Sequence, residues 1–262
     1  MEEAVYITKL SQLEYVNPKF TRLYFGQEFC ETLLPAPEEL QQVLDFVQRK
    51  KLAFTWVTPY LTQAGLKCLA NLDKLVADTL PEAEVIINDW GHLRQLKLAG
   101  LSLKPVLGRL LTKQKRGPRT LKLLPHFTPQ ALEHFQSIPA HLPHYTRWLK
   151  EQGFARLELD NLLQGINSSS AQLEASLYYP FAYITTTRWC LSNACTDPRK
   201  PTHLITPCAR ECQRFSFTLR HKEMPVPLYL KGNTIFFNNP KLPEELEELK
   251  ITRKVYEPEI PL

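Results

Sequence analysis

The amino-acid sequence predicts an α/β fold, a complete or partial (β/α) barrel with a C-terminal β-rich segment that contains cysteines. Over the N-terminal half, short β-branched or aromatic runs alternate with longer segments whose apolar residues recur with a period near 3.6, as in parallel βαβ units. The length of 262 residues suits one barrel. Later runs of strand-forming residues flank a Lys-Gly-Asn turn, which indicates antiparallel β-structure.

The N-terminal half supplies the clearest elements. Strands are expected at residues 20–26, 52–59, 83–91 and 103–111. Helices are expected at residues 35–51, 61–80 and 92–100. The first of these helices has Pro and acidic residues in its opening turn and basic residues in its last turn, which complements the helix dipole.

The C-terminal half is less regular. A helix at 143–154 leads into a strand at 155–160, and another strand is expected at 176–186. The last expected elements are strands at residues 214–220, 226–232 and 234–239 and a short helix at 243–250. No linker is evident, so the sequence predicts one barrel-like domain over residues 1–262, with residues 187–240 as a cysteine-bearing loop and β-hairpin region within it.

The composition is that of a globular protein with a mild excess of positive charge. Hydrophobic residues make up 44% of the chain and charged residues 23%, and the net charge is +5. That balance is compatible with an anionic or nucleic-acid ligand without requiring one. The N-terminus lacks the apolar run of a signal peptide, and no run reaches the ~18 apolar residues of a membrane span. We therefore expect a cytoplasmic protein without a membrane span, in which the cysteines stay reduced.

Four of the six cysteines lie close together in a polar stretch. Cys190, Cys195, Cys208 and Cys212 follow the pattern CxxxxC, twelve residues, then CxxxC. Thiolates are preferred ligands of iron–sulfur clusters and of zinc. Zinc sites usually use closer CxxC pairs, so the spacing favours an iron–sulfur cluster over zinc. Free thiols are the remaining alternative. We expect Cys68, which lies inside an amphipathic helix, to be a structural core residue.

This segment resembles the cysteine motif of the collagenase-like peptidase family U-thirty-two. Family members typically show an arginine just before the first cysteine of the motif, as Arg188 stands before Cys190, and a CxxxC close. The resemblance extends over most of the chain. Similar barrel-strand ends are found in LYFGQEFC (23–30), IINDWG (86–91) and GRLLTKQKRGPR (108–119).

The UbiV-like branch of that family is the nearest in pattern, because a cysteine follows its first strand as Cys30 does here. The resemblance implies a 4Fe-4S cluster held by one early and three late cysteines. Those positions would be Cys30, Cys195, Cys208 and Cys212. Cys190 is an additional candidate, so the fourth ligand beside the other three late cysteines is Cys30 or Cys190.

The resemblance also implies a function. It points to oxygen-independent hydroxylation of ubiquinone precursors or RNA bases, with prephenate as the suspected oxygen donor. It further implies a heterodimer with a related family member. Two alternatives stay open. One is a peptidase, as the family name suggests, and the other is a non-catalytic RNA- or protein-binding partner whose cluster is structural.

Polar residues at the ends of the predicted strands are candidates for catalysis, because barrel active sites are built at the carboxyl ends of the strands. Asn88 and Asp89 close one strand, and either could instead cap the next helix. Glu158 and Asp160 end a later strand and could supply acid–base groups inside the barrel, or face solvent. Arg188 completes the set as a group that could hold an anionic donor.

Two further features are ambiguous. The segment 113–119 carries four bases, Lys113, Lys115, Arg116 and Arg119, which could clamp a phosphate or carboxylate or contact an RNA backbone. A solvated loop is the alternative. Trp90 is expected to be either core packing or an aromatic wall of a site. The sequence has no Walker motif and no HExxH or GxSxG signature, so hydrolase chemistry by those routes lacks support.

Overall fold

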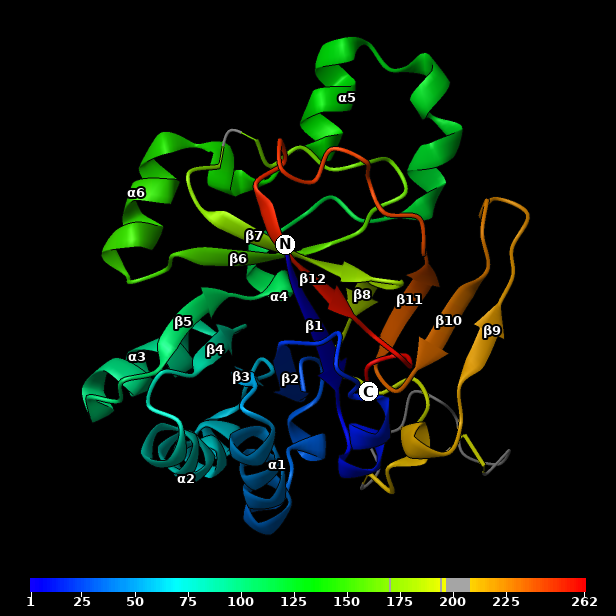
Figure 1. Ribbon diagram of the computed structural model, residues 1–262. Helices are drawn as coiled ribbons and strands as arrows, with labels where there is room; N and C mark the ends of the chain where they lie inside the picture. The colour runs from blue at the N-terminus through cyan, green and yellow to red at the C-terminus, as the bar shows by residue number, and fades with distance from the viewer. Residues whose placement is uncertain (170, 194, 197–207) are drawn as a thin grey trace.

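The computed structural model describes residues 1–169, 171–193, 195–196 and 208–262. Its centre is a closed parallel barrel with the strand order β1-β12-β7-β6-β5-β4-β3-β2 (Figure 1). The predicted (β/α) barrel is therefore confirmed. The barrel strands are β1 (Glu2–Ile7), β2 (Arg22–Gly26), β3 (Ala53–Val57), β4 (Glu84–Ile87), β5 (Lys104–Leu107), β6 (Arg156–Asp160), β7 (Glu174–Tyr179) and β12 (Ile251–Tyr256).

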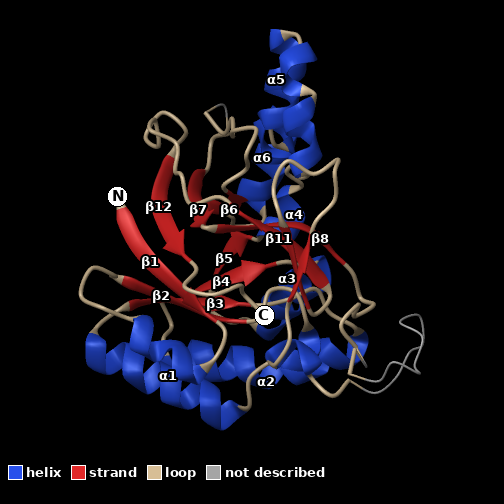
Figure 2. Ribbon diagram, turned by 90° about the vertical axis from the view of Figure 1, so that its right-hand side faces the viewer, coloured by secondary structure: helices blue, strands red, loops and turns tan. Residues whose placement is uncertain are grey.

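Helices cover the outside of the barrel unevenly. Figure 2 shows α1 and α2 along one side of the barrel and α5 standing away from it. The helices are α1 (Pro37–Lys50), α2 (Gln63–Thr79), α3 (Trp90–Ala99), α4 (Arg109–Thr112), α5 (Pro129–Gln136) and α6 (Pro143–Glu151). Short 3-10 turns are η1 (Leu10–Tyr15), η2 (Glu31–Leu33), η3 (Pro118–Lys122), η4 (Leu124–His126), η5 (Pro139–His141) and η6 (Glu211–Gln213). Among the described residues, no helix has both the length and the apolar character needed to cross a bilayer.

The helix α1 shows how the sequence makes these elements. Pro37 occupies its first turn with acidic residues after it, and basic residues close its last turn, which matches the helix dipole. Lys51 ends it in the left-handed conformation, with φ 55°. Four apolar residues at three- and four-residue spacing form the face that packs on the barrel, Leu40, Val43, Leu44 and Val47.

Because side chains alternate along the barrel strands, the buried side chains form two regions, one between the barrel and the helices and one inside the barrel. In β2, Leu23 and Phe25 point outward into the core between barrel and helices, whereas Tyr24 points into the barrel. In β6, Leu157 and Leu159 point outward in the same way. The intervening polar residues of β6 therefore face the barrel interior, because successive side chains of a strand point to opposite faces.

A second sheet follows the barrel strand β7 in the chain. It is antiparallel, in the order β8-β11-β10-β9, and lies beside the barrel in Figure 1. Phe29 at the barrel rim packs against Tyr183 and Phe236 of this sheet, with ring centroids 5.2 Å and 5.4 Å away. The predicted C-terminal β-rich region is confirmed. Its strands are β8 (Phe181–Thr186), β9 (Phe217–Leu219), β10 (Leu228–Lys231) and β11 (Thr234–Asn238).

Several sequence-based expectations were wrong in detail. The strand expected at 103–111 ends at Leu107, because Gly108 starts the single turn of α4. The strand expected at 176–186 is two strands that join different sheets. The helix expected at 243–250 is a series of turns. Its leucines, Leu246 and Leu249, pack against the core without forming a helix. The strands β1 and β12, which pair with each other and close the barrel, were not anticipated.

Candidate functional site

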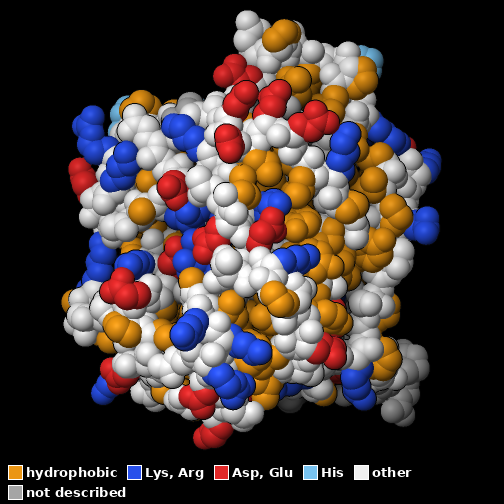
Figure 3. Space-filling model, viewed as in Figure 1, with side chains coloured by type: hydrophobic (Ala, Val, Ile, Leu, Met, Phe, Trp, Pro, Cys, Tyr) orange, Lys and Arg blue, Asp and Glu red, His pale blue; other side chains and the backbone are white. Residues whose placement is uncertain are grey.

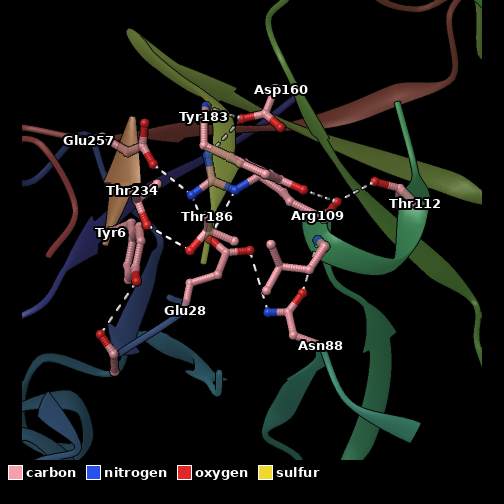
Figure 4. A network of polar contacts seen from close by, with 12 residues as sticks. Tyr6, Glu28, Asn88, Arg109, Thr112, Asp160, Tyr183, Thr186, Thr234 and Glu257 are labelled. Atoms are coloured by element: carbon pink, nitrogen blue, oxygen red, sulfur yellow. Dashed lines mark hydrogen bonds and ion pairs between the residues drawn. The ribbon is translucent and has the colours of Figure 1, made fainter. Parts of the chain in front are cut away.

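Arg109 is the centre of a polar network at the carboxyl end of the barrel. It begins α4 directly after β5, and its side chain is fully buried. Its guanidinium donates to Glu28 Oε2 at 2.9 Å, to Asp160 Oδ1 at 3.0 Å and to Glu257 Oε1 at 2.9 Å. The guanidinium carbon also lies 3.8 Å from the ring centroid of Tyr178. Figure 4 shows the three carboxylates around the guanidinium, each brought by a different strand end.

Two arginines and three acidic side chains meet in this network. Burial raises the pKa of Glu257 well above its ordinary value, despite the opposing effect of Arg109. The cations Arg109 and Arg116 face the carboxyl groups of Glu28, Asp160 and Glu257. Asp160, a candidate for catalysis, is therefore held on both oxygens by arginines and has no exposed side-chain surface. The network fills the carboxyl end of the barrel and has a structural role.

The basic segment 113–119 is divided between the network and the surface. Arg116 turns inward, donating to Asp160 Oδ2 at 2.7 Å while its guanidinium carbon lies 4.0 Å from the ring centroid of Tyr183. Lys115 is half-buried, and Lys113 and Arg119 are exposed. The segment is thus neither a uniform basic patch nor a fully solvated loop.

Glu158 lies deeper in the barrel than Asp160 and also faces inward. Its side chain is fully buried, and the Tyr24 hydroxyl donates to its Oε1 at 3.3 Å. Its Oε2 has no hydrogen-bond partner among the described residues. Burial raises the pKa of Glu158 to about 7, although the nearby Arg253 opposes the shift. The location inside the barrel matches the functional interpretation of this residue, but the surrounding core separates the carboxyl from solvent.

Asn88 joins the end of β4 to α4. Its Oδ1 accepts from the backbone N–H of Leu110 at 3.0 Å, and its Nδ2 donates to the carbonyl of Thr58 at 2.9 Å. The contact is close: a Cβ added at Gly108 would lie 2.1 Å from Asn88 Oδ1. Asn88 therefore fixes the turn that presents Arg109.

Asp89 caps α3, so the capping interpretation is the one that the geometry supports. Its Oδ1 accepts from the backbone N–H of Gly91 at 2.7 Å, and its Oδ2 accepts from that of Leu61 at 3.1 Å. We expect Asp89→Ala to lower the free energy of unfolding by about 1 kcal/mol, because an N-cap acceptor is lost. Urea denaturation followed by circular dichroism measures this change.

The matched control for that prediction is Asp89→Asn, which keeps an acceptor oxygen and should retain most of the stability. Equal unfolding midpoints for Asp89→Ala and the wild type would contradict the capping role.

Trp90, which follows the cap, lies outside the barrel. Its indole is 39% exposed and packs edge-on against Trp148 and Phe154, with ring centroids 5.2 Å and 6.1 Å away. It belongs to the surface between α3 and α6, where it lines a hollow together with Arg94 and Trp148.

A hydroxyl–imidazole–carboxylate series lies in the barrel wall. The carboxylate of Asp73 contacts His92 Nε2 at 2.9 Å, and His92 Nδ1 lies 3.1 Å from the Thr58 hydroxyl. That order of groups is the one used by hydroxyl nucleophiles. However, all three residues are fully buried, and the Thr58 hydroxyl donates to the carbonyl of Ile86 at 2.6 Å. The series is a structural hydrogen-bond chain.

Four cysteines line one hollow at the junction of the barrel and the small sheet. They are Cys30, Cys190, Cys208 and Cys212, and the hollow has a volume of about 290 Å³. We call it the thiol pocket. Arg188 also lines it. Among the described residues, no three Cys, His, Asp or Glu side chains converge as the ligands of a single metal ion would.

The walls of the thiol pocket come from distant segments. Asn233, in the β10–β11 turn, donates to the carbonyls of Phe29 and Thr187, both at 2.7 Å, and so ties the small sheet to the barrel rim. Gly232 precedes it with φ 59°, and a Cβ added there would lie 3.2 Å from Cys212 Cβ. Glycine at this position keeps the pocket open beside Cys212.

The thiols differ in their surroundings. Burial raises the pKa of Cys30 and of Cys212. Cys208 is exposed and accepts from the backbone N–H of Arg210 at 3.4 Å. Cys195, which the family resemblance implied as a ligand, does not line the pocket; Cys190 does.

A second hollow lies against the first, with Arg188 in the walls of both. Its volume is about 420 Å³, and threonines of β8 line it together with Tyr60 and Lys113. We call it the threonine pocket. Arg188 donates to the carbonyl of Leu61 at 3.1 Å, and its guanidinium carbon lies 5.1 Å from the Tyr60 ring centroid. Two cations and several hydroxyls therefore face this space.

Comparisons with known proteins give only distant likenesses. No family model matches the chain, and no curated protein matches it. The solved structure of the U32 peptidase Mk0906 aligns with 100% of this chain and 94% of its own, at 12% identity and a TM-score of 0.49. A chitinase of Trichuris suis, TsES1, aligns at 9% identity with a TM-score of 0.36, and the human pseudo-chitinase YKL-39 at 9% and 0.38; each covers 97% of this chain and 91% of its own.

Likenesses at this level carry no function over to this chain. The sequence alone did not indicate Glu28, Arg109 and Glu257 as members of the barrel network. One signal was available for Glu28, which lies two residues after the glycine that ends β2. Glu257 could not be placed because it follows β12, a strand that was not anticipated.

Proposed function

We propose that this chain is an iron–sulfur protein related to the UbiV-like branch of peptidase family U-thirty-two. The observation that carries the proposal is the thiol pocket, in which Cys30 and three cysteines of the 190–212 stretch line one volume. In a 4Fe-4S cluster each thiolate binds a different iron, so the ligands stand around a volume and not around a point. The four-thiol donor set and the space beside Gly232 both fit such a group.

Cys30, Cys190, Cys208 and Cys212 would hold the cluster. This assignment replaces Cys195 with Cys190 relative to the set implied by resemblance. A bound 4Fe-4S cluster supplies one-electron chemistry. Asn233 positions the turn that carries the pocket wall, and the apolar packing around Cys212 limits the access of water on that side.

The threonine pocket supports a role in binding an anionic small molecule next to the cluster. Lys113 and Arg188 would bind its carboxylate or phosphate, since both cations lack an ion-pair partner among the described residues. Together with the sequence resemblance, this arrangement favours oxygen-independent hydroxylation, with a donor molecule in this space. A cytoplasmic location and pairing with a related family member are parts of the same proposal.

The experiment is anaerobic purification with iron and acid-labile sulfide analysis of the wild type, Cys190→Ala and Cys195→Ala. We expect about four irons per wild-type chain, loss of most iron in Cys190→Ala, and near wild-type iron in Cys195→Ala. The two variants are matched because both remove a half-buried thiol from the same segment.

If the wild-type protein contains zinc in place of iron, or binds neither metal, the proposal of an iron–sulfur cluster is refuted. Loss of iron in Cys195→Ala with retention in Cys190→Ala would refute the ligand assignment alone. Circular dichroism of each variant separates loss of the metal from loss of the fold.

A further inference from the structure

The outer edge of the small sheet is an exposed strand. β9 is the last strand in the order β8-β11-β10-β9, and no described strand pairs with its other edge (Figure 1). Every residue from 214 to 222 is exposed. The backbone N–H and C=O groups along such an edge are free to pair with another strand.

The side chains of this edge alternate between apolar and polar. Phe215, Phe217 and Leu219 occupy every second position and are 38%, 39% and 36% exposed. Phe217 stands opposite Leu230 and Leu219 opposite Leu228 in the pairing with β10, so these side chains share one face of the sheet. Figure 3 shows apolar side chains gathered over this sheet. The apolar stripe of β9 thus continues a half-buried apolar face.

Positive charge lies at both ends of the strand. Arg214 precedes the apolar stripe, and Arg220 and Lys222 follow it. None of these three side chains has an ion-pair partner among the described residues; the nearby Glu223 is paired with Lys122 at 3.3 Å. A strand with unpaired cations at both ends and an apolar centre is complementary to a segment with acidic ends and an apolar centre.

We infer that β9 is the docking edge for an extended acidic segment of a partner protein, which adds to the sheet as a fifth strand. Main-chain hydrogen bonds to the β9 edge supply affinity, and alternate apolar side chains of the segment cover Phe217 and Leu219. Carboxylates at the two ends of the segment pair with Arg214 and Arg220. None of residues 214–222 lines the thiol pocket, and the inference makes no use of the proposed cluster.

The charges argue against a second copy of the same chain as the occupant. Antiparallel pairing of two β9 strands centred on Phe217 places Arg214 of one copy opposite Arg220 of the other at both ends. Like charges directly opposite each other destabilise a strand pair. Arg214 and Arg220 therefore destabilise the pairing of two β9 strands and favour an acidic partner.

The test uses the full chain and a labelled peptide pool in which threonine alternates with varied aliphatic and aromatic residues, with glutamates at both ends. Fluorescence anisotropy should detect binding to the wild type. Arg214→Glu combined with Arg220→Glu should weaken binding by about tenfold or more. Lys67→Glu, on an exposed position of α2, is the matched control and should leave binding unchanged.

Two further measurements separate strand addition from other modes. Peptides methylated on alternate backbone nitrogens should bind at least about tenfold more weakly, because they cannot complete the ladder. Amide hydrogen exchange of residues 217–219 should slow when the peptide binds.

The inference is overturned if no member of the pool binds, if the charge-reversed variant binds as tightly as the wild type, or if methylation has no effect. It is also overturned if an oligouridylate RNA protects residues 217–219 in place of the peptides, or if light scattering finds wild-type dimers that Phe217→Ser abolishes.

Discussion

Arg109→Leu is expected to lower the free energy of unfolding by about 3–5 kcal/mol or to prevent folding, because it leaves buried carboxylates without their cation. Burial alone lowers the pKa of Arg109, but Glu28, Glu257 and Asp160 raise it beyond its ordinary value, so the guanidinium is charged. Removing that charge leaves Glu28 buried without an ion-pair partner among the described residues and takes from Asp160 one of its two arginines, Arg116 being the other. Urea denaturation followed by circular dichroism and tryptophan fluorescence measures the loss.

The matched control is Arg119→Leu, which removes an exposed arginine that follows the same turn in sequence. We expect a change within about 0.5 kcal/mol there. Arg109→Lys keeps the charge but cannot reach three carboxyl groups at once. Its loss of unfolding free energy should therefore lie between those of Arg109→Leu and Arg119→Leu. If Arg109→Leu unfolds at the wild-type urea concentration, the network does not stabilise the barrel.

The network also explains which parts of the fold could be predicted from sequence. Local patterns were sufficient for α1 and for placing Glu158 and Asp160 on one face of their strand, because helical spacing and strand alternation are properties of a few adjacent residues. They could not tell whether that face points into the barrel or to solvent. The closure of the barrel could not be predicted, because it depends on the pairing of β1 with β12, in which Glu2 stands opposite Arg253. Contacts at such separation leave no periodic signal in either segment.

The same distinction applies to the candidate site. The spacing of the late cysteines correctly drew attention to the segment that borders the thiol pocket. The family resemblance implied Cys195 as a ligand and left the fourth ligand open between Cys30 and Cys190. Which thiol faces the pocket could not be predicted, because it depends on how the segment packs against the β10–β11 turn. The basic segment was likewise visible in sequence, but the inward turn of Arg116 follows from the position of Asp160 on a different strand.

A second large effect is expected from Glu158→Gln, which should stabilise the protein at neutral and alkaline pH. The carboxyl has a pKa of about 7 in the folded state against 4.5 for an ordinary glutamate, because it is buried. Between these values the folded state holds a proton that the unfolded state has lost, so the wild type loses stability as the pH rises. Above pH 7 the accumulated cost is on the order of 3 kcal/mol.

Glutamine removes that cost because it is neutral at every pH. The stability of Glu158→Gln relative to the wild type should therefore be near zero at pH 4.5, rise up to pH 7 and then stay level. Other buried groups such as Glu257 and Glu84 titrate in both proteins, so only the difference between the two curves is informative. Urea denaturation at a series of pH values provides both curves.

Glu133→Gln, on the outward-standing helix α5, is the control. Its free energy of unfolding should differ from that of the wild type by the same amount at every pH. A difference between Glu158→Gln and the wild type that did not vary with pH would mean that Glu158 is ionised in the barrel. In that case Arg253 would outweigh burial, since it is the group that favours the charged carboxylate most. A pH-dependent difference, by contrast, would place a neutral carboxyl beside the Tyr24 hydroxyl, able to hold its proton at physiological pH.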